Sequence, residues 1–346
     1  MPRYSGDSTD GLHWLARLED GWHGWRERRG RRRGLIPTII PFIGYGDPDW
    51  VRVLGRVVLR KPGAVPIDRF TSIRGWRSFV SIPVKSVDVE VMAGSERRMI
   101  RCDRGGVIDA AIDVRLEPGW RSIRLGIDGD EVEAPVFIVD DSHRFGIVSD
   151  VDDTVMVTAL PRPLLAAWNT FVLDEHARRP VAGMAVLYTR LLLAHPGTPI
   201  VYLSTGAWNV APTLTRFLER NLYPRGTLLL TDWGPTHDRW FRSGPEHKAN
   251  NLERLAAEFP DVSWLLVGDD GQHDERIYGD FAAAHPENVT AVAIRRLTPG
   301  EAVLAGGRSA AEAHGSGEIP WVYADDGSGM IDQLERLGLL PSRPGD

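Results

Sequence analysis

The sequence predicts a chain of two parts, a small all-β sandwich followed by an α/β unit built on a parallel sheet. Residues 49–139 contain short alternating apolar runs separated by Gly and Pro, a pattern typical of antiparallel strands. After Asp140 the pattern changes to apolar strands that alternate with helical periods. The length of 346 residues also exceeds that of one ordinary core, so two domains are expected.

Four apolar runs indicate the sandwich strands: 51–59, 87–92, 107–114 and 121–127. Turn residues such as Gly105-Gly106 and Pro118-Gly119 separate them at the spacing typical of β-sandwiches. The region resembles an immunoglobulin- or transthyretin-like module. It contains no cluster of catalytic residue types, so we expect it to bind or to scaffold.

The second part predicts a Rossmann-like sheet with helices on both faces. Strands are expected at 145–149, 200–204, 227–231, 263–267 and 289–294, and helices at 181–194, 211–221, 249–259 and 275–284. Ligands of such sheets bind beyond the carboxyl ends of the strands, where the strand order reverses. Polar residues that follow these strands are therefore the candidate site.

The first of these strands ends in three carboxylates and a hydroxyl, Asp150, Asp152, Asp153 and Thr154. Carboxylates gathered at the end of a buried strand repel one another, so they remain ionised together only around a shared cation or in a wet site. An alternative is a helix N-cap formed by Asp153 or Thr154. A cap needs one such residue, however, and four are present.

Three further polar groups follow in order along the chain. Ser204 ends the second strand and is followed by Thr205 and Gly206, Lys248 opens a helical pattern, and the strand 263–267 is followed by Asp269, Asp270 and Asp274. Each group is weak evidence by itself, because Gly-Asp after a strand is usually a turn. Their order is much more specific.

This order resembles the motifs of the haloacid dehalogenase superfamily of phosphatases, which begin with Asp-x-Asp-x-Thr. Asp-x-Asp-Asp-Thr and Gly-Asp-x-Gly-Gln-His-Asp resemble one branch in particular, the actin-patch-protein type of phosphatidate phosphatase, and specifically its bacterial members. The resemblance covers roughly residues 140 to 300 and implies a parallel sheet of the haloacid dehalogenase type. Fungal relatives have Ser where this chain has Asp270, a change that bears on the lipid substrate more than on the chemistry.

The resemblance implies a role for each residue. Asp150 would be the nucleophile that forms an aspartyl-phosphate and a ligand of Mg²⁺, and Asp152 would be a metal ligand and the general acid and base. Asp269 would complete the metal site with Asp270 or Asp274, although Asp274 could equally be a helix N-cap. Ser204 and Lys248 would stabilise the phosphoryl group. Substrate contacts are expected from Thr154, Thr205, Gly206 and Trp208, whereas His247 and His273 are more often structural or exposed.

Composition excludes several other classes. Asp and Glu number 47 against 41 Lys and Arg, a formal charge of −6, so nothing indicates a nucleic-acid partner. The single Cys102 excludes an internal disulfide and fits a reducing compartment. No apolar run approaches the ~20 residues of a membrane span, and the start lacks the order of a secretory signal. We therefore expect a cytoplasmic protein, peripheral to a membrane at most.

The expected domains are an N-terminal helix and Arg-rich segment (1–34), the sandwich (35–140), the phosphatase domain (141–300) and a C-terminal extension with a short helix (301–346). In the first segment one helical face carries Trp14, Leu15, Leu18, Trp22 and Trp25, followed by Arg26, Arg28, Arg29 and Arg31–Arg33. This pattern fits an anionic membrane surface, or a helix docked on the sandwich with solvated arginines. The connections between motifs leave little room for a folded lid, which favours a large substrate.

The leading prediction is a Mg²⁺-dependent phosphomonoester hydrolase of lipid metabolism, with phosphatidate the first substrate to consider. Two alternatives stay open: a phosphatase of a soluble phosphomonoester, and an inactive lipid- or anion-binding module of the same fold. The presence of Asp152 disfavours the inactive module, because a protein without catalysis has no need for a general acid. The oligomeric state cannot be predicted.

Overall fold

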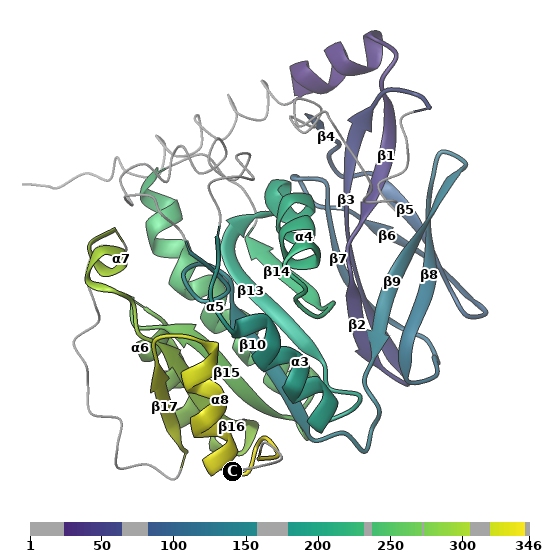
Figure 1. Cartoon of the computed structure of the whole chain (residues 1–346). Coiled ribbons are helices and arrows are strands. Elements are labelled where there is room, and N and C mark those ends of the chain that lie inside the picture. The colour runs from purple at the N-terminus through teal and green to yellow at the C-terminus, as the bar shows by residue number, and fades with distance from the viewer. Residues whose placement is uncertain are drawn as a thin grey trace, which may run out of the picture.

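The computed structural model describes residues 24–63, 82–157, 179–231, 237–271, 273–304 and 319–342, with the side chains of 237–243 left aside. A nine-stranded, mainly antiparallel sheet lies beside a six-stranded parallel sheet (Figure 1). The mixed α/β class predicted from the sequence is therefore confirmed. Among the described residues no helix is long and apolar enough to span a bilayer.

The antiparallel sheet comprises the strands β1 (Ile36–Pro41), β2 (Gly44–Asp47), β3 (Trp50–Arg60), β4 (Ile82–Pro83), β5 (Asp88–Ala93), β6 (Glu96–Arg101), β7 (Val107–Asp113), β8 (Gly119–Ile127) and β9 (Asp130–Ile138). Their order is β1-β3-β2-β9-β8-β5-β6, with β4 and β7 also paired to β3. Alternate residues such as Val51, Val53 and Val57 are fully buried, because successive side chains of a strand point to opposite faces. The four apolar runs of the sequence lie in β3, β5, β7 and β8; the immunoglobulin-like type stays a prediction.

A helix over residues 24–32 precedes β1 and packs on the antiparallel sheet through Gly30. A Cβ atom at Gly30 would lie 2.7 Å from Leu59 Cδ1 and 3.2 Å from Ile82 Cδ1, so the helix approaches the sheet closely. Trp25 and Arg28 remain exposed, and so do the arginines at 29 and 31–33. This part of the segment is docked, whereas Trp14, Leu15, Leu18 and Trp22 lie outside the described residues.

The parallel sheet contains β10 (Phe145–Asp150), β13 (Ile200–Ala207), β14 (Thr227–Thr231), β15 (Ser263–Asp269), β16 (Val289–Arg295) and β17 (Trp321–Ala324). The order is β14-β13-β10-β15-β16-β17, which is 3-2-1-4-5-6 when the strands are counted along the chain. This is the order of a doubly wound sheet, and it reverses beside β10. Every residue of β10 is buried, as expected for a central strand covered on both faces. All five predicted strands are present.

The helices are α3 (Met184–Ala194), α4 (Ala211–Arg220), α5 (His237–Glu258), α6 (Asp274–Ala284), α7 (Pro299–Leu304) and α8 (Gly327–Arg336). Figure 1 shows α3 beside α8 on the near face of the parallel sheet, and α5 beside α6 on the far face. A two-stranded antiparallel pair of β11 (Met156–Val157) and β12 (Arg179–Pro180) follows β10 in the chain and precedes α3. Because β17 pairs with β16, the parallel sheet continues past residue 300; the predicted domain limits themselves stay a prediction.

Charged side chains join the antiparallel sheet to the C-terminal end of α5. Tyr45 Oη donates a hydrogen bond to Glu258 Oε2 at 2.6 Å, and the Arg52 guanidinium forms ion pairs with Glu258 and Asp109. Arg254 Nη1 contacts Asp109 Oδ2 at 2.9 Å from the other side. The two sheets are therefore linked directly through the helix that also carries Lys248.

Candidate active site

The candidate site lies at the carboxyl edge of the parallel sheet, where the strand order reverses. Asp150 is the last residue of β10, and Asp269 is the last residue of β15. Ser204 lies in β13, which pairs with β10 on the side away from β15. Parallel strands bring these positions together although they are far apart in the sequence. Tyr188 supports the end of β10, because its hydroxyl lies 2.6 Å from Ser149 Oγ, which donates to the Asp150 carbonyl.

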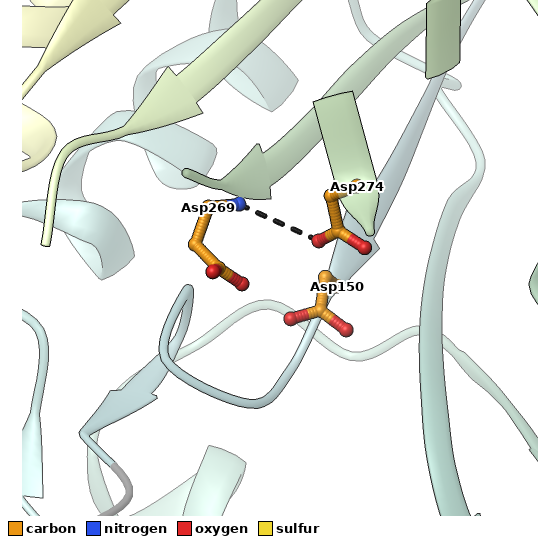
Figure 2. Close-up of side chains that lie close together, drawn as sticks. All are labelled: Asp150, Asp269 and Asp274. Atoms are coloured by element: carbon orange, nitrogen blue, oxygen red, sulfur yellow. Dashed lines mark hydrogen bonds between the residues drawn. The ribbon is translucent and has the colours of Figure 1, made fainter. Parts of the chain in front are cut away.

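Three carboxylates meet at this edge. Asp150, Asp269 and Asp274 each place an oxygen within 4.8 Å of the others, and Figure 2 shows these side chains turned towards one another. Lys248 Nζ lies 2.6 Å from Asp150 Oδ1 and 2.5 Å from Asp274 Oδ1. The lysine on α5 thus bridges the acid of β10 and the first residue of α6.

The donor set fits a divalent cation. The Asp150 side chain is buried, and its Oδ2 accepts no hydrogen bond within the described part of the chain, while its Oδ1 faces Lys248 Nζ. Burial raises the pKa of Asp150, and Asp274, Asp152 and Asp269 raise it further, against the opposing effect of Lys248. Three carboxylates face one ammonium group, so a bound dication would offset the remaining negative charge.

Electrostatics also fix the charge of the lysine. Burial alone would lower the pKa of Lys248, but Asp150, Asp274 and Asp269 outweigh it and raise the pKa. Burial raises the pKa of Asp269, and the neighbouring Asp274 raises it further. Lys248 is therefore held in its charged form, whereas the raised pKa values of Asp150 and Asp269 oppose their ionisation unless more positive charge is present.

Asp152 and Ser204 form a second contact between the strands. Ser204 Oγ donates to Asp152 Oδ2 at 3.0 Å and accepts the Gly206 amide at 3.0 Å. The hydroxyl of Thr231, the last residue of β14, donates to the carbonyl groups of Thr205 and Gly206, so β14 holds the end of β13 in place. The acid predicted to transfer protons is thus held beside the predicted phosphate-binding serine.

The structure separates the two acids that the sequence left as alternatives. Asp274 lies with Asp150 and Asp269, whereas Asp270 Oδ1 accepts the Leu297 amide at 2.8 Å and lies outside that group. The N-cap of α6 is His273, so Asp274 begins the helix rather than capping it. Residues 151–155 form turns that lead into β11, so no helix capped by Asp153 or Thr154 begins there.

The other residues predicted near the substrate lie in different surroundings. Thr154 is buried, and its hydroxyl has no hydrogen bond within the described ranges. Trp208 is buried and stacks on Phe42 of the antiparallel part with ring centroids 4.9 Å apart, so it packs between the two sheets. His247 is half-buried beside Asn251 on α5. The lid prediction concerns the connections 154–200 and 204–248, of which residues 158–178 and 232–236 lie outside the described ranges.

Sequence reasoning missed Arg295. This residue ends β16 and is only 5% exposed, yet it contacts the loop that follows Asp150. A basic residue directly after an apolar strand of a parallel sheet was the available signal, since that position lies at the same edge as the acids. Phe42 was also missed, because nothing in a β-strand pattern indicates which side chain faces a neighbouring sheet.

Residues 145–296 match the family described as phosphatidate phosphatase APP1, catalytic domain. This confirms, for that segment, the resemblance expected from the motifs. Two curated proteins are similar: an uncharacterised protein of Schizosaccharomyces pombe, 24% identical over 47% of this chain, and phosphatidate phosphatase APP1 of Saccharomyces cerevisiae, 23% identical over 44%. The similar region covers 26% of each relative, so this chain matches about a quarter of their length.

Solved structures give distant similarities. The HAD domain of the effector protein Lem4 from Legionella pneumophila is 18% identical, covers 45% of this chain and 88% of its own, and has a TM-score of 0.31. The carbohydrate acetylesterase XAC1771 from Xanthomonas citri is 12% identical, covers 76% of this chain and 69% of its own, and has a TM-score of 0.29. At these TM-scores neither structure bears on the function of the chain.

Proposed function

We propose that the chain is a Mg²⁺-dependent hydrolase of phosphomonoesters with a parallel domain of the haloacid dehalogenase type. The observation that carries this proposal is Lys248 between Asp150 and Asp274, with Asp269 completing the acidic group. A nucleophilic carboxylate, a fixed cation and a site for a divalent metal are the parts that phosphoryl transfer needs, since two anions must approach each other. The match to a phosphatase catalytic domain supports the same chemistry.

The proposed reaction has two displacement steps at phosphorus. Asp150 attacks phosphorus and forms an aspartyl-phosphate, while the bond to the leaving oxygen breaks and Asp152 donates a proton to that oxygen. Asp152 then accepts a proton from water, which attacks phosphorus and releases phosphate from Asp150. Lys248 and Ser204 stabilise the phosphoryl oxygens. Mg²⁺ held by Asp150 and Asp269, with Asp274 in support, would supply positive charge opposite the phosphoryl group.

Phosphatidate is the substrate we propose first, because one similar protein is named a phosphatidate phosphatase. The substrate would then be reached at an anionic membrane surface from the cytoplasm, with Thr154, Thr205 and Gly206 on the substrate side of the site; Trp208, which packs against Phe42, is not part of this proposal. A soluble phosphomonoester is the second candidate. The presence of Asp270 where fungal relatives have Ser makes a direct comparison of the two necessary.

The test is a phosphate-release screen of lipids, sugar phosphates and phosphopeptides with and without Mg²⁺, using wild type and Asp150→Asn. We expect turnover by the wild type and a loss of more than ~10³-fold in the variant, because an amide cannot replace the anionic nucleophile. The exposed Asp261→Asn is the matched control and should retain full activity. Near-normal release by a folded Asp150→Asn protein would refute the mechanism. Lipid binding without release from any substrate would favour the inactive binding module.

A further inference from the structure

Arg295 is a buried cation with three separate anchors. Its Nη1 donates to the Asp153 carbonyl at 2.7 Å, its Nη2 contacts Glu301 Oε1 at 2.9 Å, and its Nε donates to the Asp325 carbonyl at 3.2 Å. The anchors belong to the loop after β10, to α7 and to the turn between β17 and α8. A guanidinium is costly to bury unless its donors are satisfied, and here every nitrogen has an acceptor.

The first anchor is a loop that needs external support. Asp153 has a φ of 58°, a left-handed conformation that non-glycine residues seldom adopt. Its amide donates to the Met156 carbonyl at 2.8 Å, and Tyr223 Oη donates to the Val155 carbonyl at 2.8 Å. Arg295 supports the loop from the other side of β10, because Tyr223 lies between α4 and β14, whereas Arg295 ends β16.

The backbone of Arg295 contacts the second acidic segment. Its carbonyl accepts the Asp270 amide at 2.9 Å, and Asp269 pairs with Arg295 in the register of β15 and β16. One residue therefore contacts the loop that follows Asp150 and Asp152 through its side chain, and the segment that follows Asp269 through its main chain.

We propose that Arg295 is a positioning residue that holds the β10 loop and the β15 end in one fixed arrangement, so that Asp150, Asp152 and Asp269 converge. This inference rests on the proposed phosphatase function only for its kinetic test, since the convergence itself governs metal binding. Arg295 contacts none of the three acidic side chains in the described hydrogen bonds and acts through the backbone. Its loss should therefore reduce turnover and metal affinity rather than substrate affinity.

The test compares Arg295→Lys with wild type, and Arg296→Lys is the matched control because this neighbouring side chain is exposed and stacks over Tyr323. Lysine keeps the charge, but its three donors share one nitrogen and cannot reach acceptors that face three different guanidinium nitrogens. We expect kcat on a soluble phosphate ester to fall by about 10- to 100-fold with KM changed less than about twofold, and Mn²⁺ affinity, measured by electron paramagnetic resonance, to fall about tenfold. The control should match wild type in all three.

Two further measurements keep the proposal falsifiable. If Arg295→Lys does not fold, Glu301→Gln removes the ionic anchor at Nη2 while Arg295 keeps its other contacts, and it should show a smaller loss in the same direction, about threefold. Mn²⁺ affinity equal to that of wild type in a folded variant overturns the proposal, and so does a lower melting temperature with unchanged kcat, because the contact would then be structural only. If the wild type releases no phosphate from any substrate, the proposed function fails, and the Mn²⁺ comparison still decides the role of Arg295.

Discussion

Asp150 and Asp269 are carboxylates whose pKa values are raised by burial and by the acids around them. A group that resists ionisation is a poor nucleophile and a poor ligand unless positive charge arrives. Lys248 supplies one such charge, and a divalent metal would supply the rest. The same groups that repel one another in the protein alone would then become ligands of a shared ion.

Chelation of divalent metals should abolish phosphate release, and Mg²⁺ should restore it. Ca²⁺ should inhibit, because its longer bonds and looser geometry misplace the nucleophile. Asp269→Ala should require about tenfold more Mg²⁺ for half-maximal rate, whereas Asp270→Asn should require less of an increase, since that side chain binds the Leu297 amide. Titration of rate against free Mg²⁺ measures both. Full activity in excess chelator would contradict the metal site.

Because of His247, we expect the free energy of unfolding to decrease in acid. The pKa of His247 is lowered to about 4, mainly by burial and also by Arg254 and Lys248, against the opposing effects of a backbone hydrogen bond with Leu229 and of Asp109. Between pH about 6.5 and 4 the unfolded chain binds a proton that the folded protein does not, so the free energy of unfolding decreases as pH falls through this range. The loss should be on the order of 2 kcal/mol at pH 4. We expect denaturant unfolding of His247→Gln to vary less with pH than that of wild type, with His285→Gln at the end of α6 as control. Identical pH slopes for wild type and His247→Gln would argue against this.

The residues at the strand ends could be predicted because they share a simple rule: a polar residue directly after an apolar run of a parallel sheet lies at the ligand edge. Asp150, Ser204 and Asp269 follow that rule. Arg295 follows it too, but its partner is the carbonyl of Asp153, 142 positions away, and a backbone acceptor leaves no trace in the sequence. The contact between Phe42 and Trp208 depends on the placement of one sheet against another, which no local pattern encodes.

The junction between β15 and α6 positions Asp269 and Asp274 of the proposed metal site. A Cβ atom at Gly268 would lie 2.7 Å from Asp274 Oδ2 and 2.7 Å from Tyr278 Cε2, so the strand passes the first turn of the helix with no room for a side chain. Glycine at this point allows Asp274 to approach Lys248 and Asp269.

Gly268→Ala should therefore displace Asp274 and raise the Mg²⁺ requirement about tenfold. Gly146→Ala is the matched control, because its Cβ would lie 2.4 Å from the Trp264 ring near the start of β10, away from the acids. The control should lower stability by about 1–3 kcal/mol and leave the Mg²⁺ requirement unchanged. Mg²⁺ titrations with thermal melts of both variants check this. An unchanged Mg²⁺ requirement in Gly268→Ala would show that Asp274 can move without consequence.

Elements were predictable where periodicity was long and uninterrupted. The strands of the parallel sheet up to β16 and the helices α3, α4 and α6 lie close to their predicted bounds. The helix expected over 249–259 begins earlier, at His237. Its first part was not predictable because it contains Pro245 and lacks an apolar period. The strand β17 has only four residues, too few to distinguish from a loop without its partner β16.

At the scale of the whole molecule, exposed arginines on the docked N-terminal helix and directly after it predict that the charge of a membrane affects the rate of hydrolysis. If they reach a lipid surface, phosphatidate in anionic vesicles should be hydrolysed faster than a soluble ester, and salt should reduce the difference. Replacement of Arg28, Arg29, Arg32 and Arg33 by Gln should weaken the free energy of binding to anionic vesicles by about 1 kcal/mol per side chain near the surface. Hydrolysis on vesicles should fall accordingly, and hydrolysis of the soluble ester should not change.

Substitution is preferable to deletion of residues 1–34, because deletion also removes the packing of Gly30 on Leu59. Replacement of four other exposed arginines, Arg97, Arg98 and Arg101 on β6 and Arg124 on β8, by Gln controls for the change in total charge. Equal activity of both sets on vesicles would refute a membrane role for the helix. A soluble phosphomonoester would then be the better substrate to pursue.

The link between Arg52, Glu258 and Tyr45 has a consequence for how the molecule unfolds. Phe259 lies between Tyr45 and Trp50 of one sheet and Trp264 of the other, with ring centroids 5.8, 5.6 and 6.1 Å away. Separation of the sheets would expose these rings to water and leave Glu258 without its cationic partner. The two sheets should therefore melt together, as one calorimetric transition, and an isolated parallel part would be an aggregation-prone fragment rather than a minimal enzyme.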